Sequence, residues 1–227
     1  MTRQEFEQRF SIQLNEQQKQ AVQTVEGPVL LLAVPGSGKT TVLVTRLGYM
    51  IHCKGIDPSR ILTVTYTVAA TKDMAARFAA KFGPELAEQL EFRTINSLCV
   101  SVLKYYGDKT GKTPHQLLNN EKRIAGILAE IYQRVERVYP TDGDLKNIRT
   151  LITYIKNMML NEDEIEALDE EAECKISVIY REYCSKLKEL QMIDYDDQMV
   201  YAYVMLKKIP WLLEYFQELY PYICVDE

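Results

Sequence analysis

The sequence has few of the residues on which many hydrolases and metalloproteins depend. Only two histidines, His52 and His115, occur among the 227 residues, and they lie far apart in the sequence. Zinc sites built from several histidines and Ser/His/Asp catalysis therefore lack candidates. The five cysteines are odd in number and include no CxxC pair. This pattern favours buried thiols in a reducing compartment over a disulfide framework.

Long apolar runs are also missing. The longest, residues 29–34, is far short of the roughly 20 residues that a membrane-spanning helix needs. The first ten residues, MTRQEFEQRF, are charged and lack the apolar segment of a secretory signal. We therefore expect a cytoplasmic protein with no membrane partner. Apolar residues make up 47% of the chain and charged residues 26%, a composition that excludes wholesale disorder and predicts a sizeable core.

Neither sign of charge dominates strongly. The net charge of −5 argues, taken alone, against a nucleic-acid-binding protein. The balance is uneven, however, because residues 1–113 carry a net charge of +4 and residues 114–227 one of −9. Eight of the acidic residues fall within 162–173, where the simplest interpretation is a solvated linker and helix start. A cation site is disfavoured there because the Gly-centred turn of an EF-hand loop is missing.

Apolar spacing predicts a parallel α/β layer in the first part of the chain. Continuous apolar runs at 29–34 and 61–66 predict central strands covered on both faces, and 91–94 is a weaker strand candidate. Helical patterns alternate with these runs, at 16–25, 39–53, 67–82 and after Thr94.

A polar, Gly- and Pro-containing segment at 107–114 ends this pattern. Only helices are predicted from there to residue 190, at 120–138, 145–159 and 171–190. Two more helices, 195–207 and 210–219, then precede a β-like run at 222–225. The simplest topology is an α/β domain of residues 1–113 and 192–227 with an all-helical domain, 114–191, inserted into it.

The segment AVPGSGKT at 33–40 has the spacing and context of a phosphate-binding loop, between an apolar run and a helical pattern. Its small residues let backbone N–H groups surround phosphate oxygens, and the following helix N-terminus attracts anions. Lys39 is expected to reach the β and γ phosphates, and the Thr40 hydroxyl to ligate Mg²⁺. The expected nucleotide-binding residues are Ala33, Val34, Pro35, Gly36, Ser37, Gly38, Lys39, Thr40 and Thr41.

The last five residues, ICVDE, supply the carboxylates that nucleotide hydrolysis also needs. Asp226, at the carboxyl end of an apolar strand, would lie beside the phosphate-binding loop of a parallel sheet and ligate Mg²⁺. Glu227 would be the general base that orients the attacking water. Catalysis is thus expected from Lys39, Asp226 and Glu227, with ATP and Mg²⁺ as cofactors.

Six segments together resemble the UvrD/Rep/PcrA-like superfamily 1 DNA helicases. They are LNEQQKQAV, AVPGSGKT, ILTVTYTVAATKDM, TINSLC, IDYDD and the final VDE, in that family's order and approximate spacing. The resemblance implies a RecA-like P-loop sheet, incomplete in this chain, and 3′-to-5′ movement on single-stranded DNA in repair, replication or recombination. It also implies adenine recognition by Gln18 and DNA contacts by Thr65, Tyr66, Thr67, Thr94 and Asn96.

Several positions depart from the family pattern. Thr41 replaces an arginine near the adenine, which implies weaker nucleotide affinity. Val68 and Ala69 replace Asn and Lys, and Ile95 and Asn96 replace an aromatic residue and a histidine, which implies weaker DNA contacts. The family's later motifs and second RecA-like domain do not follow VDE. We therefore expect a fragment that binds Mg-nucleotide weakly, hydrolyses it poorly and unwinds nothing.

Two other functions remain open from the sequence. A small P-loop kinase would share the loop, but it would need an arginine-bearing lid, and the helical stretch has no Arg-rich segment. A non-catalytic interaction module could use the acidic helical face to hold a protein partner.

Overall fold

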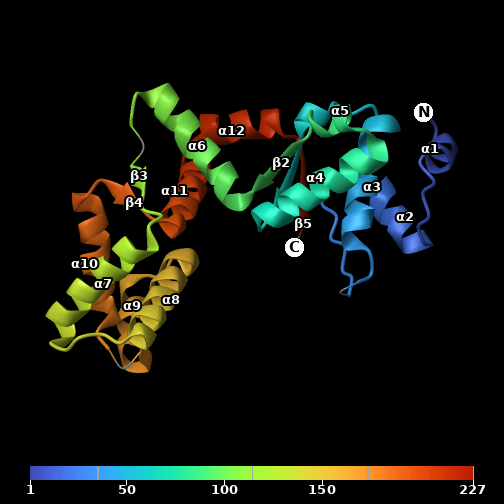
Figure 1. Cartoon of the computed structure of the whole chain (residues 1–227). Coiled ribbons are helices and arrows are strands. Elements are labelled where there is room, and N and C mark those ends of the chain that lie inside the picture. The colour runs from blue at the N-terminus through green and yellow to red at the C-terminus, as the bar shows by residue number, and fades with distance from the viewer. Residues whose placement is uncertain (35, 114, 173, 227) are drawn as a thin grey trace. The chain divides into compact units, whose positions relative to one another are not determined.

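The computed structural model describes residues 1–34, 36–113, 115–172 and 174–226 and is mixed α/β (Figure 1). The chain divides into two compact units. Unit 1 comprises Met1–Leu98 and Leu213–Glu227, and unit 2 comprises Cys99–Leu212. The unit borders fall within α6 (Ile95–Thr110) and α12 (Pro210–Leu219). The domain borders predicted at 113/114 and 191/192 stay predictions.

A three-stranded parallel sheet lies in unit 1. Strand β1 (Ile61–Thr65) is central and pairs with β2 (Glu91–Thr94) on one side and β5 (Tyr222–Asp226) on the other. All five residues of β1 are buried, as a continuous apolar run predicts for a central strand. The strands predicted at these three places are confirmed.

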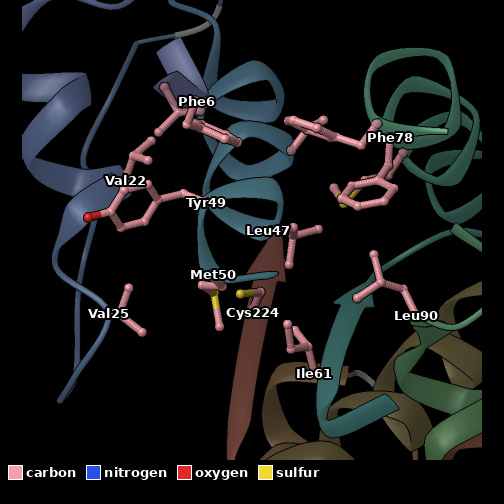
Figure 2. Close-up of a cluster of buried hydrophobic side chains, with 14 residues drawn as sticks. Phe6, Val22, Val25, Leu47, Tyr49, Met50, Ile61, Phe78, Leu90 and Cys224 are labelled. Carbon is pink, nitrogen blue, oxygen red and sulfur yellow. The ribbon is translucent and has the colours of Figure 1, made fainter. Parts of the chain in front are cut away.

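Helices of unit 1 pack an apolar core against this sheet. They are α1 (Arg3–Arg9), α2 (Glu16–Gln23), α3 (Lys39–His52), α4 (Val68–Phe82) and the short α5 (Pro84–Ala87), with a 3₁₀ turn, η1, at Pro58–Arg60. Figure 2 shows side chains from α1, α3 and α4 gathered around Leu47, with Ile61 and Cys224 contributed by the sheet. This core holds α3 against β5.

Unit 2 is mainly helical and has a core of its own. Besides most of α6, it holds α7 (Glu121–Glu136), α8 (Asp142–Met158), α9 (Glu162–Ala172), α10 (Ile176–Glu189) and α11 (Tyr195–Lys208). Two short strands, β3 (Gln116–Leu117) and β4 (Met192–Ile193), form a parallel pair. Isoleucines and leucines at helical spacing on α7, α8 and α10 bury against each other.

The strand predicted at 29–34 is wrong. The described residues of this run have no strand hydrogen bonding, and Leu30 and Leu32 are each 82% exposed. A cleft of about 670 Å³ lies between residues 25–31 and β5, so the run does not reach the free edge of β5. Apolar character makes a segment fit for a buried strand, but a strand also needs a partner edge within hydrogen-bonding distance.

Smaller differences occur around unit 2. The acidic stretch predicted as a linker and helix start is helix α9 from Glu162 to Ala172, and its Glu162 and Glu166 both accept from Arg181. Helix α6 continues to Thr110, past the start of the predicted break at Gly107, which is buried within the helix. The helices-only prediction, which ran to residue 190, is wrong at the two residues of β3, which pair with β4 just beyond that stretch.

Candidate functional site

The loop before α3 has the backbone that anion binding requires. Gly36 and Gly38 have φ of +79° and +85°, a region that L side chains rarely adopt. Gly38 is the N-cap of α3, and glycine has no side chain with which to cap the first N–H groups. These groups and the helix dipole therefore favour an anion at this point. Pro35, predicted as part of the loop, lies outside the described residues.

Gln18 joins α2 to this loop. Its Oε1 accepts from the Asn15 N–H at 3.0 Å, which closes a capping box at the start of α2. Its Nε2 donates to the Ser37 carbonyl oxygen at 3.2 Å. The structure thus brings Gln18 and the predicted phosphate-binding loop together, although 19 residues separate them in sequence. Adenine recognition by the same amide stays a prediction.

Lys39 and Asp226 border one cleft. Lys39 begins α3, and its Nζ donates to the Ala33 carbonyl oxygen at 3.4 Å. Asp226 ends β5, and both residues line the cleft of about 670 Å³ between residues 25–31 and β5. A lysine at a helix N-terminus and a carboxylate at a strand end thus line the same cleft. A site that binds both a phosphate group and its metal ion needs this combination of side chains.

The remaining loop residues differ in exposure. Thr40 is half-buried in the first turn of α3, next to Lys39, whereas Thr41 and Val34 are exposed. Cys224 of β5 also lines the cleft, and burial raises the pKa of its thiol, which Arg46 lowers in part. Cys224 therefore stays a thiol at neutral pH and is no candidate nucleophile.

Arg46, in the middle of α3, connects two helices of unit 1. Its guanidinium donates to the backbone carbonyl oxygens of Ala21, Thr24 and Val25. These carbonyls lie at the end of α2 and just after it, where helices leave carbonyl groups without intrahelical partners. Arg46 thereby ties α3 to α2. Backbone acceptors carry no sequence signal, so these contacts were not predictable from the residues.

The predicted DNA-contact residues lie around the carboxyl edge of the sheet. The register aligns Thr65 with Thr94 on one side and Asp226 on the other. Thr65 is buried, and its hydroxyl bonds the Thr67 carbonyl and the Thr71 hydroxyl. Thr67 caps α4 by accepting from the Ala70 N–H, and the Thr94 hydroxyl accepts from the Ser97 N–H. The threonines therefore have structural roles of their own.

Tyr66 differs from these threonines. It lies between β1 and α4, and 77% of it is exposed. An exposed tyrosine beside a strand end offers a ring face to a ligand, whereas Asn96, in the first turn of α6, is half-buried. Of the predicted contact residues on this edge, Tyr66 is the one best placed to stack on a base.

No cluster of three or more His, Cys, Asp or Glu side chains suited to a metal occurs among the described residues. A magnesium ion bound with a nucleotide needs fewer protein ligands, because phosphate oxygens and water supply the rest. Thr40 and Asp226 offer the hard oxygen donors that Mg²⁺ prefers. Glu227, the predicted general base, lies outside the described residues. Within those residues, no helix is both long and apolar enough to cross a bilayer.

The sequence is similar to that of known proteins over nearly its whole length. The profile of the UvrD/REP helicase N-terminal domain matches residues 14–227. The ATP-dependent DNA helicase PcrA of Bacillus subtilis is 31% identical over 216 residues, and that of Leuconostoc citreum is 29% identical over 215. PcrA of Staphylococcus aureus is 28% identical over 216 residues. Each alignment covers 94% of this chain and 29% of the relative, so the chain spans under a third of their length.

Proposed function

The chain belongs to the UvrD/REP helicase family, and from that membership we propose that it supplies the ATP-binding portion of an ATP-dependent DNA helicase. The parent activity would be 3′-to-5′ movement on single-stranded DNA. The observation that carries the proposal is the shared cleft of Lys39 and Asp226. In this proposal unit 1 is a RecA-like domain, and unit 2 is the helical domain inserted into it.

The loop and α3 would bind the triphosphate. Backbone N–H groups from Gly36 onward and the N-terminus of α3 would receive phosphate oxygens, and Lys39 would neutralise the β and γ phosphates. Lys39 would exchange its present acceptor, the Ala33 carbonyl oxygen, for phosphate. Gln18, held beside Ser37, would meet the adenine edge with its amide.

The Thr40 hydroxyl and the Asp226 carboxylate would hold Mg²⁺. When bound, the ion neutralises charge that develops on the transferred phosphate. The residues fit this role because both are oxygen donors and Asp226 borders the same cleft as Lys39. Glu227 would orient the attacking water. Tyr66, exposed at the sheet edge, would stack on a base of single-stranded DNA, an interaction tolerant of sequence.

The test is binding of a fluorescent ATP analogue with and without Mg²⁺. Lys39→Ala is expected to weaken binding at least tenfold, because the principal cation for the β and γ phosphates is lost. Asp226→Asn is expected to leave binding without Mg²⁺ nearly unchanged and to remove the gain that Mg²⁺ gives. Lys72→Ala, on the exposed side of α4, is the matched control and should bind as the original chain does.

Equal affinity of the Lys39→Ala and Lys72→Ala variants would place the nucleotide elsewhere and contradict the proposal. Hydrolysis by the 227-residue chain alone is expected to be slow. Rapid hydrolysis abolished by Lys39→Ala would refute that expectation. Phosphoryl transfer from ATP to a small acceptor molecule would instead favour the alternative function, a small P-loop kinase.

A further inference from the structure

Polar contacts attach α2 to α3 and the loop before it at two places. Near the start of α2, the Gln18 Nε2 donates to the Ser37 carbonyl oxygen at 3.2 Å, just before α3 begins. At the end of α2, the Arg46 guanidinium of α3 donates to three backbone carbonyl oxygens, those of Ala21, Thr24 and Val25. The two attachments lie at opposite ends of a short helix, so together they hold its position against α3.

The Arg46 guanidinium is occupied by these carbonyl groups although the residue lines the nucleotide cleft. Its Nη1 donates to Ala21 at 2.6 Å and also to Thr24, and its Nη2 donates to Val25 at 3.4 Å. In the described part of the chain Arg46 forms no ion pair. Arg46 is therefore a cation that holds backbone rather than one that waits for a phosphate.

Two backbone groups fix which way round the Gln18 amide lies. Its Oε1 accepts from the Asn15 N–H at 3.0 Å, and its Nε2 donates to the Ser37 carbonyl oxygen. A flipped amide would face an N–H with its own NH₂ group and a carbonyl with its own oxygen, so it would lose both bonds. Within the described residues the amide makes only these two bonds. One N–H group and one oxygen lone pair are left for a ligand.

An amide held in this orientation matches adenine and mismatches guanine. Adenine presents an amino donor beside the N7 acceptor, whereas guanine presents two acceptors, O6 and N7. The N–H group left on Gln18 can donate to N7 of either base, but the oxygen lone pair meets a donor only on adenine. On guanine two oxygens would face each other. The choice of base therefore depends on where the Gln18 amide lies, and that depends on the position of α2.

We propose that Arg46 is a positioning residue that sets the preference for adenine over guanine nucleotides. This role rests on the proposed function, in which the base of the nucleotide meets Gln18. Arg46 holds the end of α2, and the start of the same helix carries the amide, so Arg46 acts without contacting base or phosphate. Loss of the guanidinium would let α2 shift on α3. The amide would lose its match to adenine, while Lys39 and the loop glycines would still bind the triphosphate.

Three competitors measure the base and phosphate contacts separately. ATP, GTP and inorganic tripolyphosphate, each with Mg²⁺, displace the fluorescent ATP analogue from the full 227-residue chain. The original chain should prefer ATP to GTP by about fivefold or more, the least that a bidentate contact between an amide and a base provides. Arg46→Met should bring the affinities for ATP and GTP close together and leave that for tripolyphosphate unchanged. Lys39→Ala should weaken all three and keep the preference.

Gly48→Ala separates positioning from a general loss of stability. Gly48 is also on α3 but faces α4, where an added Cβ would lie 2.2 Å from the Cζ of Phe82. This variant strains the same helix on another side and should keep the preference for ATP. Arg46→Lys should retain part of the preference, because a single ammonium can still reach some of the carbonyl oxygens. It also tests the role if Arg46→Met does not fold, which circular dichroism shows.

Gln18→Ala shows whether Arg46 acts through the amide. This variant should lose the preference for ATP, and Gln18→Ala/Arg46→Met should lose no more of it, because both changes remove the same contact. A full preference in both Arg46 variants would overturn the inference. A fall in tripolyphosphate affinity as large as that in Lys39→Ala would also overturn it, since Arg46 would then be a phosphate ligand.

The same titrations distinguish failure of this inference from failure of the proposed function. Equal affinities of the original chain for ATP and GTP, with binding that still depends on Lys39, would overturn the inference alone. Binding that does not depend on Lys39 would contradict the proposed function and the inference together.

Discussion

Arg46 shows how one side chain can fix the position of the nucleotide cleft. It lines the cleft, yet its hydrogen bonds go to three carbonyl oxygens at and after the end of α2. A hydrogen bond to a charged group contributes about 1.5–3 kcal/mol to the free energy of unfolding. A buried carbonyl group that loses its donor also lowers stability by its desolvation penalty. Arg46 therefore stabilises the α2–α3 junction, which also holds Gln18 beside the loop.

Arg46→Met is expected to lower the free energy of unfolding by about 2–3 kcal/mol, because it keeps the apolar stem and removes the donors. Urea unfolding followed by circular dichroism measures this change. Arg46→Lys, which offers a single ammonium in place of the guanidinium fork, should recover only part of the stability. Full stability in Arg46→Met would show that water replaces the guanidinium at these carbonyls.

Lys156 is the most deeply buried charged residue among those described, with 4% of it exposed. Its Nζ lies 2.7 Å from Asp194 Oδ2 and 2.8 Å from Asp197 Oδ1, and the Tyr183 hydroxyl donates to Asp194 Oδ2 at 3.1 Å. Burial disfavours all three charges, but attraction outweighs it for two of them, so the pKa of Lys156 is raised and that of Asp194 is lowered. For Asp197 burial prevails over the attraction to Lys156, and its pKa is raised. The cluster joins α8, α10 and the start of α11.

Lys156→Met is expected to destabilise unit 2 by about 3–5 kcal/mol at pH 7, since two buried carboxylates lose their cation. Without Lys156 the pKa of Asp194 rises above its ordinary 3.8, so folding takes up a proton as the pH falls. The stability difference from the original chain should therefore shrink between about pH 7 and about pH 4.

Denaturant unfolding across that pH range is the measurement. Lys186→Met, at an exposed ion pair with Glu189, is the control and should change stability by less than about 1 kcal/mol at every pH. A Lys156→Met difference that stays constant with pH would mean that Asp194 and Asp197 find other partners.

At the scale of elements, Gly48 sets how closely α3 and α4 pack. A Cβ at this position would lie 2.2 Å from the Cζ of Phe82, whose ring is buried against Phe6, Phe10 and Phe78. The ring can move aside only by displacing these neighbouring rings. Close contact between these two helices therefore depends on a residue without a side chain.

Gly48→Ala is expected to destabilise unit 1 by about 1–3 kcal/mol, because overpacking outweighs the helix propensity of alanine. Gly126 on α7 is the matched control, since nothing lies within 4 Å of its added Cβ. Gly126→Ala should stabilise its unit by about 0.5–1 kcal/mol. Thermal unfolding compares the two variants, and a stabilising Gly48→Ala would show that Phe82 can shift.

Local pattern predicts most elements, and the failures have physical causes. Helix α3 follows from apolar spacing after the loop glycines, and helix α11 begins at a capping box formed by Asp194 and Asp197, so local sequence is sufficient to place both helices. Composition predicts a strand at 29–34, but whether a strand forms depends on a distant edge, here that of β5. The loop glycines are likewise predictable, whereas the Gln18–Ser37 and Arg46–carbonyl contacts are not, because their acceptors are backbone atoms.

At the scale of the whole molecule, average properties conceal two different units. The net charge of −5 argues against binding nucleic acid, yet the chain belongs to a helicase family. Binding depends on local charge, and the lysines of residues 99–113 and 201–212 lie in a unit that also holds the acidic stretch 162–173. Global charge is therefore a poor guide when basic and acidic segments are separated along a chain.

The buried apolar residues of the described chain form one main core in each unit, around α3 and α4 in unit 1 and around α7, α8 and α10 in unit 2. Stability is local when cores are separate, so each unit should open with its own free energy. Hydrogen exchange measured by mass spectrometry tests this with the two destabilising variants. Lys156→Met should lower protection in α8 and α10 and leave β1 and α3 unchanged, and Gly48→Ala should do the reverse. Parallel losses in both units for either variant would mean that the chain unfolds as one cooperative body.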